Sequence, residues 1–274
     1  MVIDFLRDRL PSRLGGRRPA PAGDLPPNVG LETDVGPLLL PAHDQVMRPL
    51  IGRDGFWEQE ESEMLRGLLR PGMSFVDIGA HVGYMSLLAA RAVGPAGSGV
   101  AVEPAPGNVA LLRANLAANQ VTNVEVLVAA AWSEAGRVPF SLSPGNTGDN
   151  RAYTVPDAEV IDVPAVALDD VLAPDRIFEV VKVDAQGTDQ RAIAGMERTL
   201  RRSRSVLVVE FWPPGITEFG DVPLDVLAYY RDLGFDLRVV GEAQAGPPVS
   251  LPWVVELCAA RPTEFCNLVL RPAW

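Results

Sequence analysis

Four acidic residues stand where short apolar runs of the sequence end. They are Asp77 after SFV, Glu103 after GVAV, Asp184 after FEVVKV and Glu210 after SVLVV, and residues 130–132 hold the same place after another run. The carboxyl ends of parallel strands meet at one edge of a sheet, and ligands bind beyond that edge. A region built only for core packing would not need carboxylates there. The spacing therefore predicts a ligand site at one sheet edge.

The first run leads into the turn VDIGAHVG, where two glycines flank a change from strand to helix. Glycine lets the backbone bend sharply near a ligand, and the helix after Gly83 offers free N–H groups to a carboxylate or phosphate. The turn lacks the GxGxxG pattern of dinucleotide folds. An acidic residue with small residues two and six positions later is typical of methyltransferases. This spacing predicts Asp77 beneath the amino group of a methionine moiety, with an ordinary tight turn as the alternative.

Glu103 follows the second apolar run, 26 residues after Asp77. An acidic side chain at this position can accept hydrogen bonds from both hydroxyls of a ribose. Because this holds for NAD and for S-adenosylmethionine alike, the residue predicts a nucleoside and does not select one cofactor. An exposed carboxylate at a strand end is the alternative interpretation.

The segment FEVVKVDAQGTD carries two charged residues, Lys182 and Asp184, that alternate with valines. A charged pair on an otherwise apolar strand is costly unless the charges are paired or functional. Asp184 is the first candidate for a catalytic residue, because it could orient an acceptor, take a proton or hold a metal ion. A helix cap or a simple Lys–Asp pair is the alternative.

Two further residues are candidates for a general base. His43, in PAHDQ, would serve if its segment folds over the site, and Glu210 would serve if it faces the acceptor. A surface histidine and a plain strand-end charge are the respective alternatives. Asp184 and Asp189 are too few ligands to decide whether a divalent metal binds, so metal dependence stays open and we assign no metal ligands.

Strands and helices must alternate to position these residues. The expected strands cover residues 74–79, 99–104, 124–132, 178–187, 205–213, 235–240 and 264–272, with two more at 137–142 and 159–166. The expected helices cover residues 58–69, 84–94, 107–120, 168–173, 188–202 and 223–234. Such alternation is typical of βαβ units. It predicts a Rossmann-like α/β fold, with a mainly parallel central sheet and helices on both faces.

Composition divides the chain into three parts. Residues 1–30 predict a flexible N-terminal lead-in, residues 31–73 an N-terminal cap, and residues 74–274 the domain that holds the site. The net charge of −11, without a basic stripe, argues against a nucleic-acid partner and favours a small molecule. No apolar run is long enough to span a membrane.

The chain has two cysteines, Cys258 and Cys266, which form neither a CxxC pair nor a zinc motif. We expect them to be reduced, partly buried thiols of a cytoplasmic protein. The sequence leaves the oligomeric state open.

Several motifs, in order, resemble the FkbM family of S-adenosylmethionine-dependent methyltransferases over roughly residues 34–212. They are FVDIGAHVGYMS, VEPAPGNVALLRANLAAN, VLVAAAWSEAG, VPAVALDDVL, VVKVDAQGTDQRAIAGM and VVEFWP. The resemblance implies a class I methyltransferase fold and S-adenosyl-L-methionine as cofactor. Residue 81 is more usually Asn in the family, and His81 keeps a polar side chain that tolerates a left-handed backbone. Residue 186 is more usually Glu, and Gln186 removes a charge, which counts against a metal at that loop.

The resemblance also implies roles for individual residues near the cofactor. Asp77, Gly79 and Gly83 would shape the methionine side, and His81 would lie beside the cofactor. Glu103 would bind the ribose. The residues that would meet adenine are Ala130 and Ala131, with Trp132 either packing on the ring or lying in the core.

The activity implied is methyl transfer to a hydroxyl of a small natural product or its sugar. One alternative is N-methylation of an amine such as an aminosugar, because an acidic protein attracts a cationic acceptor. A weaker alternative is a nicotinamide-dependent oxidoreductase, against which the missing GxGxxG and Tyr-x-x-x-Lys patterns weigh, and a last one is a non-catalytic binding module. We expect acceptor specificity to reside in residues 31–60, 143–156, 212–222 and 242–253.

Overall fold

The structure of the protein is a computed structural model, and it describes residues 25–241 and 249–274. Most of the predicted lead-in, residues 1–24, lies outside the described residues, and so does part of the predicted acceptor loop at 242–253. The first strand already begins at Asn28, so its first three residues lie within the predicted lead-in. The predicted boundary at residue 30 therefore falls within a strand.

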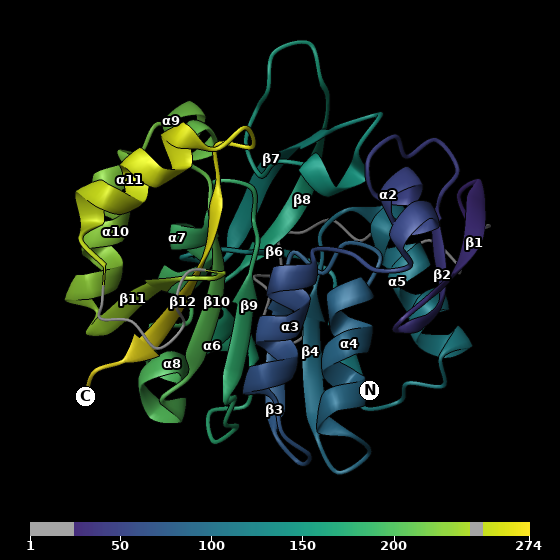
Figure 1. Cartoon of the computed structure of the whole chain (residues 1–274), viewed down its shortest axis with the longest axis horizontal. Helices are drawn as coiled ribbons and strands as arrows, with labels where there is room; N and C mark the ends of the chain where they lie inside the picture. Colours follow the sequence, from purple (N-terminus) through teal and green to yellow (C-terminus); the bar gives the residue numbers. More distant parts are fainter. Residues whose placement is uncertain (1–24, 242–248) are drawn as a thin grey trace.

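A seven-stranded sheet forms the centre of the molecule, in the order β11-β12-β10-β9-β3-β4-β5 (Figure 1). The strands from β10 to β5 in this order run parallel, and β12 runs antiparallel to β10 and β11. The mainly parallel sheet predicted from the sequence is confirmed. Its bounds are β3 Ser74–Ile78, β4 Ser98–Val102, β5 Val124–Leu127, β9 Val180–Val183, β10 Val206–Phe211, β11 Phe235–Val239 and β12 Cys266–Pro272.

Helices cover both faces of this sheet, and a separate hydrophobic core lies between the sheet and the helices on each face. Apolar residues at alternate strand positions enter different cores because successive side chains point to opposite faces. One face is covered by α2 Met47–Asp54, α3 Gln59–Leu68, α4 Tyr84–Val93 and α5 Pro106–Ala118. The other is covered by α6 Leu168–Val171, α7 Asp189–Ala194, α8 Glu197–Ser203, α9 Pro213–Phe219, α10 Pro223–Asp232 and α11 Leu251–Ala260.

Two smaller sheets flank the central one. The hairpin of β1, Asn28–Thr33, and β2, Gly36–Pro41, packs against α5 near one end of the molecule, opposite α10 and α11 (Figure 1). The other sheet has the order β6-β8-β7. Its strands are β6 Ala130–Ala131, β7 Gly136–Leu142 and β8 Glu159–Val166, and the short helix η1, Thr147–Asp149, lies in the connection between β7 and β8.

The predicted third strand, 124–132, is wrong as a single element. Its first half, β5, pairs with β4, but Ala130–Ala131 leaves the central sheet and pairs with Ala165 and Val166 of β8. The backbone N–H of Trp132 then donates to Val166 O at 2.8 Å. An unbroken apolar run cannot reveal which neighbour each half pairs with, so the sequence pattern merged two strands.

The predicted helix 188–202 is also two helices, α7 and α8, which meet at Gly195 and Met196. A Cβ at Gly195 would lie 1.8 Å from Trp132 O, so the backbones touch there. Helices α2, α9 and α11 were not predicted. Proline stands in the first turn of α9 and α11, a start signal that could have found both.

One face of the central sheet carries a row of polar side chains. Phe75, Val180 and Val208 enter the core beneath α3 and α4. Because side chains alternate along a strand, the next positions on that face are Asp77, Lys182 and Glu210. The register places Asp77 opposite Lys182 and Glu210 opposite Asn267. Polar groups therefore cross β3, β9, β10 and β12 on the face that α3 covers.

Candidate active site

A cavity of about 550 Å³ opens where the parallel strands end. Its wall includes backbone and side chains that follow β3, β4, β9 and β10, together with parts of α2, α3 and η1. This is the sheet edge at which the strand-end carboxylates predicted a ligand site. The predicted site residues that line it are Gly79, His81, Glu103, Ala130, Ala131, Asp184 and Glu210.

The turn after β3 forms part of the wall of this cavity. Gly79 has φ +72°, and a Cβ there would lie 1.8 Å from Asp184 O, so the turn admits only glycine. His81 has φ 51°, which confirms the predicted left-handed backbone. Gly83 also has a positive φ, but it packs against Leu112 of α5 and is absent from the cavity wall. Gly83 therefore serves the packing of the turn.

The His81 side chain links the turn to η1. Its Nε2 lies 2.7 Å from Thr147 Oγ1, and its backbone N–H donates to Glu103 Oε2 at 2.9 Å. Burial lowers the pKa of His81 to about 4, so the ring is neutral near pH 7. A neutral imidazole bonded to a threonine fits a structural role beside the cavity.

Glu103 is buried at the end of β4, where local donors hold its carboxylate. Oε1 accepts from Ala105 N at 2.9 Å and from Asn108 Nδ2 at 3.3 Å, and Oε2 accepts from His81 N at 2.9 Å. Burial raises the pKa of Glu103 to about 7, although these donors oppose the shift. A carboxylate has about four lone-pair sites, so Oε2 retains capacity for a further donor.

Asp77 lies behind the cavity wall. It is 2% exposed, its Oδ2 accepts from Ser86 Oγ at 2.5 Å, and its Oδ1 lies 3.7 Å from Lys182 Nζ. Lys182 lines the cavity and Asp77 does not. Asp77 thus anchors Lys182 and α4 from the layer beneath the cavity.

Lys182 is the only lysine of the chain, in which every other basic side chain except the two histidines is arginine. Its Nζ donates to Gly79 O and to Asp184 Oδ2, both at 3.2 Å. Burial opposes its charge, but the carboxylates of Asp184, Asp77 and Glu61 raise the pKa of Lys182 above its usual range. The sequence analysis noted Lys182 as a charge on an apolar strand but did not use the fact that it is the one lysine of the chain, which could have marked it as a site residue.

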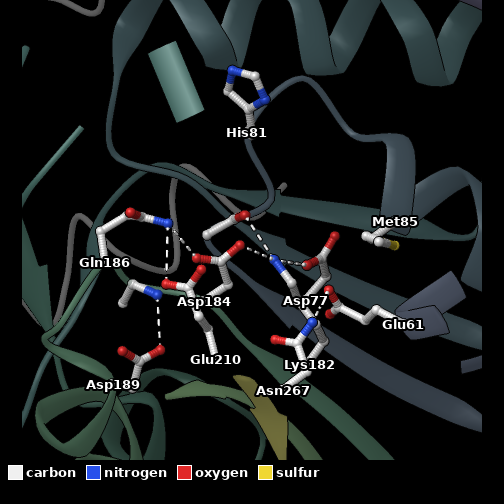
Figure 2. Close-up of polar contacts among 12 residues, drawn as sticks. Glu61, Asp77, His81, Met85, Lys182, Asp184, Gln186, Asp189, Glu210 and Asn267 are labelled. Atoms are coloured by element: carbon white, nitrogen blue, oxygen red, sulfur yellow. Dashed lines mark hydrogen bonds and ion pairs between the residues drawn. The ribbon is translucent and has the colours of Figure 1, made fainter. Parts of the chain in front are cut away.

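Lys182, Asp184, Gln186 and Glu210 form what we call the β9–β10 cluster. Gln186 Nε2 lies 2.8 Å from Asp184 Oδ1 and 3.2 Å from Glu210 Oε2, and Figure 2 shows the amide nitrogen facing both carboxylates. Burial, followed by the charges of Asp184 and Asp189, raises the pKa of Glu210 well above its usual value. Gln186, a departure from the family pattern, therefore connects two of the predicted catalytic residues.

Two glutamates at the start of α3 also line the cavity and were not predicted. Glu61 is 4% exposed and accepts from Asn267 Nδ2 at 3.3 Å, whereas Glu58 is half-buried. Burial and the neighbouring Glu58 raise the pKa of Glu61 well above its usual value. Glu61 precedes Met64, Leu65 and Leu68 at helical spacing. The sequence could therefore have predicted that Glu61 lies on the buried face of α3.

Other predicted residues lie away from the cavity. His43 is exposed and does not line it, while the neighbouring Asp44 accepts from Val46 N and Arg48 N at the start of α2. Trp132 packs edge-on against Phe219, with ring centroids 5.8 Å apart. Neither His43 nor Trp132 thus lines the cavity that holds most of the other predicted residues.

The predicted acceptor segments contribute unequally to the cavity wall. Segments 31–60 and 143–156 supply several residues, and 212–222 supplies Trp212. The described part of 242–253 supplies none, and the wall instead includes Thr263 and Phe265 from the connection between α11 and β12. Helix α11 begins at Leu251, so the last three residues of the segment that had been predicted as a loop are helical.

Within residues 25–241 and 249–274, no group of three or more His, Cys, Asp or Glu side chains is arranged to hold a metal ion. No helix in the same residues is long and apolar enough to cross a membrane. Cys258 and Cys266 are free and buried, with their Sγ atoms 3.4 Å apart. The prediction of free thiols is confirmed, and they are more deeply buried than expected.

Comparison with known proteins places this site in a family. The Methyltransferase FkbM domain matches residues 77–237. A curated protein-L-isoaspartate O-methyltransferase from Triticum aestivum is 35% identical over 86 residues, which are 31% of this chain and 34% of that protein. The chain thus matches about a third of the length of this relative.

Solved structures of methyltransferases are distant neighbours of the fold. The methyltransferase FkbM of Methylobacillus flagellatus KT is 15% identical with a TM-score of 0.47, over 76% of this chain and 50% of that one. The O-methyltransferase TomG of Streptomyces achromogenes is 18% identical with a TM-score of 0.46, over 84% and 87%. Because the family match at residues 77–237 covers more than half of the chain, this protein belongs to the FkbM family of S-adenosylmethionine-dependent methyltransferases.

Proposed function

We propose that this protein transfers a methyl group from S-adenosylmethionine to a hydroxyl of a small natural product or its sugar. One observation carries the proposal: a single cavity joins a nucleoside-type carboxylate, Glu103, to the carboxylates of Asp184 and Glu210. The first suits the ribose of a cofactor, and the other two suit a hydroxyl that must lose a proton. FkbM family membership supports the same activity.

The residues around the cavity fit S-adenosylmethionine. Its volume of about 550 Å³ lies in the range of small-ligand sites. Gly79 lines the cavity and has no room for a Cβ beside Asp184 O, so the turn lies directly against the backbone that follows β9. Glu103 retains a lone pair for a ribose hydroxyl, and the small side chains of Ala130 and Ala131 leave space for adenine. Asp77 would act indirectly, by anchoring Lys182 and α4.

The chemistry asks the protein chiefly for alignment and proton removal. The cofactor supplies a methyl group already activated by its sulfonium. The wall at α3, β9 and β10 must hold the acceptor oxygen in line with that methyl group. A carboxylate of the β9–β10 cluster then receives the hydroxyl proton, with Asp184 the first candidate from the sequence and Glu210 beside it.

An amine acceptor is the second candidate. Glu58, Glu61, Asp184 and Glu210 all line the same part of the cavity, with Lys182 as the cation among them. Such a wall would attract a protonated amine, and N-methylation would follow once the amine lost its proton. This clustering of carboxylates is the specific observation that keeps the alternative open.

We also propose the organisation and setting of the enzyme. Residues 31–73 would cap the cavity, since Met47, Trp57 and Glu61 line it, and residues 74–274 would form the methyltransferase domain. The acceptor would be a small molecule and not a nucleic acid, in keeping with the net charge of −11. Two free thiols are the state expected of a reducing cytoplasm, where we place the reaction.

Mass spectrometry of reaction products tests this function. The protein is incubated with methyl-deuterated S-adenosylmethionine and a panel of hydroxylated and amino-substituted sugars and macrolides. The proposal expects a gain of one labelled methyl group on an oxygen, located by fragmentation, and loss of this product in Asp184→Ala. Methylation on nitrogen would favour the second candidate. Absence of S-adenosylhomocysteine binding by the wild type would overturn both.

A further inference from the structure

Gln186 stands between two carboxylates of the cavity wall. Its Nε2 lies 2.8 Å from Asp184 Oδ1 and 3.2 Å from Glu210 Oε2. An amide nitrogen carries two hydrogens, one for each carboxylate. The reverse orientation would place the amide oxygen against two anions, so the hydrogen bonds fix the direction of the side chain. Its backbone has φ 49°, a conformation that few residues adopt.

The two carboxylates differ in how firmly they are held. Asp184 accepts from Gln186 on one oxygen and from Lys182 Nζ, at 3.2 Å, on the other. For Glu210, the bond from Gln186 is the one hydrogen bond that the structure gives the carboxylate within residues 25–241 and 249–274. Asp184 is thus fixed by a cation and an amide, whereas Glu210 keeps one oxygen available to the cavity.

The charged surroundings of Glu210 come from several elements. The titratable groups that influence it or are influenced by it are Lys182 and Asp184 near β9, Asp189 of α7, Glu58 and Glu61 at α3, and Cys266 of β12. Most of these groups are acidic, and Lys182 is the cation among them. Burial and the acidic neighbours raise the pKa of Glu210, which makes its ionised form a stronger base than an ordinary carboxylate.

We propose that Gln186 is a positioning residue that, together with Lys182, fixes Asp184 and leaves Glu210 as the base for the acceptor proton. The inference rests on the proposed function and assigns roles within its site. During transfer the acceptor oxygen forms a bond to the methyl carbon as the carbon–sulfur bond of the cofactor breaks. The hydroxyl proton passes to Glu210, and the sulfur keeps the electron pair of the broken bond.

The single lysine offers a test that needs no acceptor. In protein labelled with ¹⁵N-lysine, the side chain of Lys182 gives the one lysine signal, whose shift follows the titration of nearby carboxylates. Glu210→Gln identifies the inflection that belongs to Glu210. The proposal expects this inflection to move up by about one pH unit in Gln186→Leu, because a donor to the ionised form is lost. It expects a larger rise in Gln186→Glu, which adds a third carboxylate.

Kinetic measurements complete the test, with a compound of the panel that the wild-type enzyme methylates as the acceptor. Below its pKa a base is protonated, so the acidic limb of kcat/KM should move to higher pH in Gln186→Leu and Gln186→Glu. Glu210→Gln should lower kcat at least a hundredfold, with S-adenosylhomocysteine affinity within threefold of wild type. The inference would be overturned if the Glu210 inflection, as seen in the Lys182 signal, stayed at the wild-type pH in both Gln186 variants. A Glu210→Gln enzyme of near-normal kcat would overturn it as well. Neither result would touch the proposed function, which is tested separately by S-adenosylhomocysteine binding and by the labelled product of the wild-type protein.

Discussion

The two halves of the cavity are built in different ways. On the β3–β4 side, Glu103 is held by donors from Ala105, Asn108 and His81, the farthest only 22 residues away in sequence. On the β9–β10 side, Lys182 contacts Gly79, 103 residues away, and Asn267 contacts Glu61, 206 residues away. One half is local and backed by backbone donors, and the other is a charge network between distant segments.

This difference has a physical consequence. Backbone N–H groups that satisfy Glu103 stay in place when one side chain is changed, so the cofactor half should tolerate substitution except where the backbones touch. The β9–β10 side gathers several buried carboxylates around one lysine, and an uncompensated buried charge is strongly destabilising. We therefore expect stability to depend on the second half, and cofactor affinity on the first.

The largest effect is expected from the lysine at the centre of the network. Lys182→Met leaves Asp77, Asp184 and Glu61 without their cation, which should cost about 3–5 kcal/mol of unfolding free energy. Urea unfolding measures this. Arg231→Met, which removes the exposed pair with Asp232, is the control and should cost less than about 1 kcal/mol. Equal losses in the two variants would contradict the comparison.

On the β3–β4 side of the cavity, Gly79→Ala should abolish cofactor binding. The added Cβ would lie 1.8 Å from the backbone oxygen of Asp184, at φ +72°. Gly72→Ala is matched, because Gly72 has φ +86° with nothing within 4 Å of the added atom. Calorimetry with S-adenosylhomocysteine should show more than a hundredfold loss for Gly79→Ala and none for Gly72→Ala. A retained affinity in Gly79→Ala would show that this turn does not hold the ligand.

The pH dependence of binding should report on Glu103. Its pKa is raised to about 7, and the ionised form accepts hydroxyl donors better. S-adenosylhomocysteine affinity should therefore rise by about tenfold between pH 6 and pH 8, then level off. Glu103→Gln should bind weakly without this dependence. Asp189 also has a pKa raised to about 7, so its titration must be distinguished from that of Glu103. The Asp189→Asn variant should therefore keep the wild-type pH dependence of binding.

The smallest effect is expected at His81. Asn also tolerates the left-handed backbone that His81 adopts with φ 51°, so His81→Asn should change turnover and cofactor affinity less than tenfold. His81→Val, with a β-branched side chain in that conformation, should lose more. A loss beyond about a hundredfold in His81→Asn, roughly 2.7 kcal/mol, would instead assign chemistry to the imidazole.

The same contrast explains what could be predicted from the sequence. Glu103 and the turn at Gly79 follow their strands directly, so strand-end spacing located them. Glu61 comes near Lys182 and Asn267 only through the order of the sheet and the placement of α3, which a strand pattern does not encode. The sequence analysis considered only the charge that Gln186 lacks, because its hydrogen bond to Glu210 depends on where β10 lies. His43 failed to reach the cavity because Asp44, next to it, is the residue buried at the start of α2.

Ligand choice tests the central claim most directly. Wild-type protein is titrated by calorimetry with S-adenosylhomocysteine and, in parallel, with NADH, each at pH 8 where Glu103 is ionised. We predict one-to-one binding of S-adenosylhomocysteine and no binding of NADH. Binding of NADH without binding of S-adenosylhomocysteine would contradict the assignment of the cavity to methyl transfer.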